Sequence, residues 1–167
     1  LDALVVSHAD SDHAGGLRSV MAHFEVLHPY ASFDLSSRLQ QPGLRCTAGD
    51  SWQWDGVTFT FLHPQESSPT LLESPKQKTR KLKVSTNARS CVLKIAGQHH
   101  AALLPGDLPA QQERALVKTY GDALNAEVVV APHHGSATSS SAEFVQATRA
   151  RHVVALVGHR NRFQHPD

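Results

Sequence analysis

The sequence has few cysteines, which cross-link small secreted proteins, and no long apolar run of the kind that spans a membrane. Among its 167 residues it has two cysteines, one methionine and two tyrosines, and 6% of all residues are aromatic. Two cysteines are too few for a disulfide scaffold or a four-thiolate zinc site. No uninterrupted apolar run approaches the roughly 18 residues of a membrane-spanning helix. The first residues, up to Val6, lack the basic flank and cleavage site of a signal peptide.

Strong net charge is also missing. The formal net charge is +1, the pI is about 8.1, and hydrophobic and charged residues make up 40% and 19% of the chain. This composition excludes a disordered or acidic-tail protein, and it does not by itself indicate a nucleic-acid binder. The length fits one soluble domain of about 100–200 residues. Because the chain starts within a strand-like apolar run and ends as abruptly, we expect a domain whose opening strands lie outside this sequence.

The two cysteines, Cys46 and Cys91, leave the cellular compartment open. Nothing in their spacing favours a bridge, so the simpler interpretation is two small apolar side chains. A single disulfide in an oxidising compartment is the alternative.

Apolar periodicity predicts strands that alternate with helices, as in an α/β layered fold. The predicted strands cover residues 1–6, 57–61, 91–95, 99–104, 127–131 and 153–157, and the predicted helices cover 16–24, 109–120 and 142–148. Residues 64–84 change character, because serines and prolines precede a run of five Lys and Arg residues. Such a segment predicts a basic surface loop, which is usually just solvated but could also hold a phosphate backbone.

Histidine, with 12 residues, is the unusually abundant type, and the strongest motif contains two of them. His8, Asp10, Asp12 and His13 follow a predicted strand and precede a helix, and Gly15-Gly16 allows the sharp turn between them. Four ligand-type side chains in six residues would repel or remain poorly solvated unless a cation neutralised the carboxylates. The motif therefore predicts a metal site at the end of this strand.

Two further strand ends carry similar side chains. Asp107 follows the strand at 99–104, and the pair His133-His134 follows the strand at 127–131. Ligands that follow the ends of neighbouring strands meet most simply at one edge of a sheet. Taken with the first loop, they predict one site built from three segments.

These residues resemble the metallo-β-lactamase superfamily, whose loop is normally HxHxDH. The likeness is stronger to one branch, the C-terminal domain of ComEC-type competence proteins, which are inner-membrane channels for DNA uptake. The resembling segments are residues 4–16, 87–93, 104–107, 131–136 with 139–141, and 161–166. The resemblance implies an αββα sandwich, here without its opening strands, spanning 1–167 as a partial domain.

The resemblance also implies one or two divalent metal ions, zinc or manganese. The first would be held by His8, Asp10 and Asp107, and the second by Asp12, His13, Asp107 and either His133 or His134. Asp10 stands where the superfamily usually has a second histidine, and no histidine lies between Leu82 and Ile95. Carboxylates in these positions suit harder ions such as Mn²⁺.

Further residues are assigned to catalysis or substrate contact through the same motifs. The predicted catalytic residues are Asp12, Asp107, His134 and His165, and the predicted substrate-binding residues are Asn87, Ser90, Ser136, Asn161 and Arg162. The remaining histidines have no companion ligand at useful spacing and are interpreted as ordinary surface or core residues: His23, His28, His63, His99, His100, His152 and His159.

The resulting hypothesis is a metal-dependent phosphodiesterase that cleaves incoming DNA through a metal-activated water. One alternative is a small-molecule phosphodiester or lactone hydrolase, and another is a non-catalytic module that binds DNA or a channel partner. The resemblance further implies a full-length protein in the bacterial inner membrane, with this domain outside the cytoplasm. Its partners would be DNA and the membrane channel of the same protein.

Overall fold

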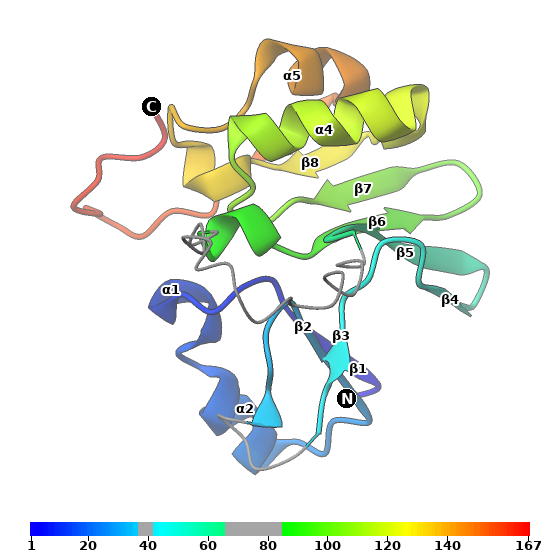
Figure 1. Cartoon of the computed structure of the whole chain (residues 1–167), viewed down its shortest axis with the longest axis vertical. Coiled ribbons are helices and arrows are strands. Elements are labelled where there is room, and N and C mark those ends of the chain that lie inside the picture. The colour runs from blue at the N-terminus through cyan, green and yellow to red at the C-terminus, as the bar shows by residue number, and fades with distance from the viewer. Residues whose placement is uncertain (37–41, 66–84) are drawn as a thin grey trace, which may run out of the picture.

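The structure is a computed structural model and describes residues 1–36, 42–65 and 85–167. Two β-sheets form the centre of the molecule (Figure 1). The smaller sheet is parallel in the order β1-β2-β3, with β1 at Ala3–Val6, β2 at His28–Ala31 and β3 at Leu44–Arg45. The loop of ligand-type residues therefore begins directly after β1, at the carboxyl end of this sheet.

The larger sheet has the order β4-β5-β6-β7-β8-β9. Its strands are β4 at Ser51–Trp54, β5 at Val57–His63, β6 at Val92–Ala96, β7 at Ala101–Leu104, β8 at Val128–Val130 and β9 at His152–Val154. Pairing is antiparallel from β4 to β7 and parallel from β7 to β9. The carboxyl ends of β7, β8 and β9 consequently share one edge, and the segments with Asp107 and His133-His134 leave from it.

Helices cover the outer face of each sheet, as Figure 1 shows. The short helix α1 spans Ser11–Ala14, α2 spans Leu17–His23, α4 spans Ala110–Tyr120 and α5 spans Ala142–Thr148. Three 3₁₀ turns complete the described elements: η1 at Asn87–Arg89, η2 at Gly121–Leu124 and η3 at Pro132–Gly135. In the described ranges, no helix has the length and apolar character needed to cross a bilayer.

Three separate apolar clusters show that the molecule has four layers. Leu17 of α2 packs with Val6 and Ala31 of the small sheet, and Phe144 of α5 packs with Leu103 and Val129 of the large sheet. The third cluster lies between the sheets and contains Cys46, Phe61, Cys91 and Leu93, with Tyr30 and Trp52 stacked beside them. Helices, sheet, sheet and helices therefore follow one another, which confirms the predicted αββα class.

Most predicted elements lie within a few residues of the observed ones, and α5 has the predicted bounds. The prediction missed α1, β2, β3 and β4, and it extended β7 and β9 too far, since His99 and His100 lie in the turn before β7. Strand β2 contains Pro29, which normally argues against a strand, and β3 has only two residues. Of the predicted basic loop at 64–84, all but Pro64 and Gln65 lies outside the described residues.

The interpretation of the cysteines as two unlinked apolar side chains is wrong, because Cys46 and Cys91 form a disulfide. Cys46 follows β3 of the small sheet, and Cys91 precedes β6 of the large sheet, so the bridge joins the two sheets. The partners are 45 positions apart in the sequence, and their Cα atoms are 5.8 Å apart. Only the folded arrangement of the two sheets brings them together, which is why spacing gave no indication.

A buried carboxylate fixes the segment that precedes α5. Glu113 lies in α4 with no solvent exposure, and its two carboxylate oxygens accept hydrogen bonds of 2.7 Å from the backbone N–H groups of Ser140 and Ser141. Ser140 has a left-handed backbone, with φ of 59°. The carboxylate thus satisfies two amides that the start of α5 leaves without intrahelical partners.

Replacing Glu113 with alanine should lower the free energy of unfolding by about 3 kcal/mol, because one buried and one partly buried N–H group would lose their acceptors. Urea denaturation monitored by circular dichroism measures the change. Glu113→Gln keeps one acceptor oxygen and should cost less than the alanine variant. As a matched control, Glu143→Ala removes an exposed glutamate and should change stability by less than about 0.5 kcal/mol. Equal stability of the Glu113 and Glu143 alanine variants would contradict this role.

Candidate metal centre

The first component of the site is a fully buried histidine with one unpartnered nitrogen. His8, two residues after β1, is 0% exposed. Its Nε2 atom has no hydrogen-bond partner and lies 3.7 Å from both Asp10 Oδ2 and Asp107 Oδ2. Two atoms that each bind one ion at about 2.1 Å are separated by about 3–4 Å. The arrangement therefore has the spacing of a ligand set, and a buried imidazole nitrogen without a partner is otherwise costly.

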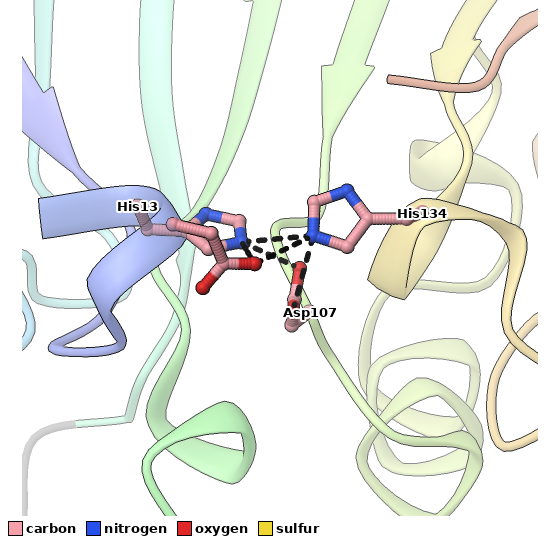
Figure 2. A group of neighbouring side chains, drawn as sticks. His13, Asp107 and His134 are labelled. Atoms are coloured by element: carbon pink, nitrogen blue, oxygen red, sulfur yellow. Dashed lines mark hydrogen bonds and ion pairs between the residues drawn. The ribbon is translucent and has the colours of Figure 1, made fainter. Parts of the chain in front are cut away.

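The second component is a tighter group formed by Asp12, His13, Asp107 and His134 (Figure 2). One ligand atom from each residue lies within 4.8 Å of the corresponding atom of the others. His13 Nε2 is 3.1 Å from Asp107 Oδ1 and 3.2 Å from His134 Nε2. His134 Nε2 is 3.2 Å from Asp12 Oδ2. Two imidazoles and two carboxylates thus converge from α1, the loop after β7 and the turn after β8.

Neighbouring groups hold these imidazoles in orientation. His134 Nδ1 donates a hydrogen bond of 2.8 Å to the Leu156 carbonyl, which leaves the lone pair of a neutral ring on Nε2, the atom that faces the cluster. The Ser7 hydroxyl lies 3.1 Å from His8 Nδ1 and 3.0 Å from His13 Nδ1. Such outer hydrogen bonds commonly fix the tautomer and ring orientation of histidine ligands.

The charges in the cluster perturb one another. The hydrogen bond to Asp107 raises the pKa of His13, whereas burial, together with the nearby His13, lowers the pKa of His8. Burial alone would raise the pKa of Asp107, but the hydrogen bond from His13 and the charges of the surrounding imidazoles outweigh it and lower this pKa. Asp107 is therefore a carboxylate and His8 a neutral imidazole near pH 7, which are the protonation states that bind metals.

The backbone of η3 is strained where it delivers His134. His133 and His134 have φ values of 49° and 58°, in the left-handed region that non-glycine residues rarely adopt. Gly135 follows with φ of 83°, and a Cβ atom placed there would lie 2.7 Å from Pro166 Cβ. Two successive non-glycine residues in this region cost free energy that the surrounding structure must supply, a pattern found mainly at functional sites.

The structure places His133 beside the cluster and His134 inside it. His133 Nε2 lies 3.7 Å from Asp107 Oδ2, and its Nδ1 is 3.0 Å from the Thr138 hydroxyl. The His165 ring is 6.1 Å from the His133 ring, with Nδ1 3.2 Å from Asp167 Oδ2 but outside hydrogen-bond geometry. Of the two adjacent histidines, His134 alone belongs to the four-residue group, and its assignment as the metal ligand stays a prediction.

The predicted substrate-binding residues fall into two groups. Ser90 is fully buried, and its hydroxyl accepts the N–H of Asp107 and lies 3.5 Å from His8 Nδ1. The Asn161 Nδ2 group donates to the backbone carbonyl of His165, and Asn161 Oδ1 accepts the backbone N–H of His165. These two residues position others, so a direct substrate contact is not favoured by their placement.

The other three predicted substrate residues lie closer to the surface or to the turn beside the cluster. Asn87 lies in η1 and is half-buried beside Thr86. Arg162 is exposed, and its guanidinium lies 4.6 Å from the Phe163 ring. Ser136 is buried, with its hydroxyl 3.1 Å from that of Thr138. Among them, Asn87 and Arg162 have the exposure that a substrate contact needs.

Three residues with clear roles at the site were not predicted. Ser7 contacts both His8 and His13, Thr86 donates a 2.7 Å hydrogen bond to Asp10 Oδ1, and Thr138 contacts His133. Ser7 adjoins the ligand motif and could have been identified from it. Thr86 and Thr138 carry no sequence signal, because their contacts depend on how η1 and η3 fold over the cluster.

A cavity of about 290 Å³ adjoins the group of four ligand-type residues. His13, Asp107 and His134 form its polar end. Its remaining wall is mostly apolar and includes Val5 and Leu93, which extend into the space between the two sheets. The cluster is therefore reached by solvent and has room beside it for a ligand.

The donor set fits divalent cations. Imidazoles and carboxylates suit zinc, manganese and iron, and the unpartnered His8 Nε2 would gain the partner it lacks. His8, Asp10 and Asp107 could hold one ion, and the group of Asp12, His13, Asp107 and His134 a second, with Asp107 reaching both. Without a cation, three carboxylates in this space depend on the imidazoles for charge compensation.

Comparison with known proteins gives matches that cover nearly the whole chain. The chain is 37% identical over 166 residues to competence protein ComA of Neisseria gonorrhoeae, 29% identical to recombination protein 2 of Haemophilus influenzae, and 26% identical to ComE operon protein 3 of Bacillus subtilis. Each match covers 99% of this chain but only 21%, 19% and 21% of these relatives, so the chain spans about a fifth of their length. The predicted likeness to competence proteins is confirmed.

A solved structure and a family model agree with the fold. CmlA, a diiron β-hydroxylase from Streptomyces venezuelae, superposes with a TM-score of 0.51 over 92% of this chain and 35% of its own, at 12% identity, a likeness of fold alone. The model of the metallo-β-lactamase superfamily matches residues 1–159. The chain belongs to the metallo-β-lactamase superfamily.

Proposed function

We propose that this domain is a metal-dependent phosphodiesterase that cleaves DNA entering the cell. The observation that carries the proposal is the convergence of His8, Asp10 and the four-residue group of Asp12, His13, Asp107 and His134 on one solvent-reached site. The competence and recombination proteins among its relatives support DNA as the substrate. The full-length protein would lie in the bacterial inner membrane beside a channel of the same chain.

In this proposal the chain's own residues would bind the metal ions, orient the ligand rings and supply a proton to the leaving oxygen. When bound, divalent cations would lower the pKa of a coordinated water and neutralise charge on the phosphate oxygens. Asp12, Asp107 and His134 hold the ligand geometry, and the Leu156 carbonyl keeps His134 Nε2 free of a proton. His133 lies outside the four-residue group, its side chain is 29% exposed and its Nε2 lies 3.7 Å from Asp107 Oδ2, so it is a group able to give a proton to the leaving oxygen. The His165 ring lies 6.1 Å from the His133 ring, close enough to contact the same substrate.

The disulfide supports the proposed location of the domain. Disulfides persist in oxidising compartments and are rare in the bacterial cytoplasm. The Cys46–Cys91 bridge joins the two sheets close to the site, since the N–H of Cys91 donates to the carbonyl of Ser7. A domain on the outer side of the inner membrane would meet DNA before it passes through the channel.

One observation favours a second candidate, hydrolysis of a small phosphodiester or lactone. The cavity beside the cluster holds about 290 Å³ and has a mostly apolar wall, which suits a compact organic ligand better than a DNA backbone. This cavity lies next to the same metal ligands, so the two functions share one centre and differ only in what is recognised.

The purified protein should cleave a single-stranded oligonucleotide when Mn²⁺ or Zn²⁺ is supplied, and a chelator should return the rate to background. Cleavage should also weaken steeply with rising salt, because phosphate contacts release counterions. Cleavage is followed by gel electrophoresis, with bis(p-nitrophenyl) phosphate and a lactone as parallel substrates. Efficient hydrolysis of a small substrate without oligonucleotide cleavage would assign the second candidate, and bound metal without any hydrolysis would assign a non-catalytic module.

A further inference from the structure

A pocket of about 400 Å³ lies beside η1, and among the residues that the structure describes it is lined by two arginines and no carboxylate. Arg45 reaches it from the end of β3, and Arg89 reaches it from η1. Ser32 and Thr47, whose side chains carry hydroxyl groups, also line it. Guanidinium groups bind phosphate oxygens through paired N–H donors, and hydroxyls add further donors, so this lining suits a phosphate group.

The two arginines differ in how free they are. Arg45 Nη1 donates a 2.6 Å hydrogen bond to the Ser32 carbonyl and lies near the charge of Asp34, so its guanidinium is held in place. Arg89 is exposed, and in the described part of the chain its guanidinium makes no hydrogen bond or ion pair. One oriented cation and one available cation therefore face the same pocket.

The turn that carries Arg89 is tied to the candidate metal centre at both ends. Thr86, just before η1, donates to Asp10 Oδ1, and Ser90, just after it, accepts the N–H of Asp107. His63 Nε2 donates to the Ala88 carbonyl within the turn, and burial lowers the pKa of His63, so this imidazole is neutral. The pocket and the cluster are thus connected through one short, well-anchored turn.

The disulfide ties the segment that carries Arg45 to the same turn. Cys46 directly follows Arg45 and lines the pocket, while Cys91 lies two residues after Arg89. The bridge fixes their Cα atoms 5.8 Å apart, so the segments that carry the two arginines cannot separate. Because the two backbone segments are already held together, binding an anion orders mainly the Arg89 side chain, which loses less conformational entropy than ordering two separate segments would.

We propose that the Arg45–Arg89 pocket is a second phosphate subsite, which holds a phosphodiester of the DNA strand that flanks the one at the metal centre. This inference rests on the proposed DNA substrate and adds the residues that select a strand over a single phosphodiester. A substrate with one phosphate fills the centre only, whereas an oligonucleotide fills both positions. The pocket therefore contributes to binding and not to the chemical step.

Fluorescence anisotropy with a labelled single-stranded oligonucleotide tests the subsite in metal-free protein. Arg45→Ala and Arg89→Ala should each weaken binding about tenfold, as expected for a lost charge-assisted contact. Each should also make the dependence of log Kd on log salt less steep by about 0.7. Arg114→Ala, which removes an exposed arginine of α4 that pairs with Glu143 of α5, should leave both the affinity and the salt dependence unchanged. Denaturation midpoints of the three variants verify that they are folded.

Activity measured with added metal distinguishes the proposed phosphate subsite from the proposed DNA-cleaving function on which it rests. Both pocket variants should raise KM for the oligonucleotide and leave turnover of bis(p-nitrophenyl) phosphate within about twofold of wild type. Oligonucleotide binding and cleavage unchanged by either variant would overturn the subsite alone. Failure of the wild type to bind the oligonucleotide would overturn DNA as substrate and the subsite with it. Displacement of the oligonucleotide by inorganic phosphate at matched ionic strength would assign the pocket to a free anion instead.

Discussion

Asp107→Asn should reduce metal-dependent cleavage by at least about 10³-fold, equivalent to about 4 kcal/mol of transition-state stabilisation. Asp107 is the side chain that reaches both proposed ligand sets, since its Oδ2 atom is 3.7 Å from His8 Nε2 and its Oδ1 atom is 3.1 Å from His13 Nε2. The amide has nearly the same shape but no negative charge, so both sets would lose their shared anion. Metal content after dialysis, measured by mass spectrometry, should fall together with activity.

The matched control for this prediction is Asp122→Asn. Asp122 is an exposed aspartate in η2 that pairs with Arg149 and is not a member of either proposed ligand set. Its amide variant should keep full metal content and activity. His134→Ala provides a second test, because it removes one ligand-type ring without altering Asp107. Asp107→Asn protein that retains wild-type metal content and cleavage would contradict the proposed centre, even if His134→Ala were inactive.

Removal of the disulfide should give the largest change in stability. In the chain-entropy account, a bridge that closes 45 residues stabilises the folded state by about 4 kcal/mol. The double variant Cys46→Ala/Cys91→Ala should lower the free energy of unfolding by about this amount. Alanine avoids burying a hydroxyl at these sites, where Cys46 and Cys91 are 3% and 2% exposed. Guanidinium denaturation followed by tryptophan fluorescence measures the effect.

Reductant supplies the control for that prediction. Dithiothreitol should lower the denaturation midpoint of the wild type toward that of the double variant and leave the double variant unchanged. A wild-type midpoint that does not respond to complete reduction, verified by thiol titration, would contradict a stabilising role. Because Cys46 and Cys91 flank the two arginine-bearing segments, reduced protein should also bind the oligonucleotide less tightly than oxidised protein.

The sequence allowed prediction of those parts of the molecule whose signals are local. The loop from His8 to His13 follows an apolar strand and carries its ligand-type residues within six positions, so it could be located without a structure. The strands that precede Asp107 and the His133-His134 pair have continuous apolar character, and their parallel pairing in the large sheet explains why these two segments meet. The expectation that all three segments leave one sheet was wrong, because the segment with His8 and His13 follows β1 of the small sheet, and the packing of the two sheets brings it to the others. Helix α5 has a clear apolar period, and its predicted bounds coincide with the observed ones.

What could not be predicted depends on contacts between distant segments. The Cys46–Cys91 bridge, the hydrogen bond from Thr86 to Asp10 and the pairing of Arg45 with Arg89 in one pocket each join segments that only the folded sheets bring together. Strand β2 contains a proline and owes its conformation to pairing with β1 and β3 rather than to its own propensity. The choice between His133 and His134 required the left-handed turn of η3.

The distribution of the cluster along the chain has a consequence for folding. His13 and His134 are 121 positions apart, and Asp12 and His134 are 122 apart, so their meeting closes a loop of most of the chain. Contacts of such long range form late, after local helices and hairpins. A partly folded chain presents only the ligands of its first loop, whereas the complete set exists once both sheets have docked. Divalent cations bound by the proposed centre would therefore select the fully folded chain, and their binding free energy would add to its stability.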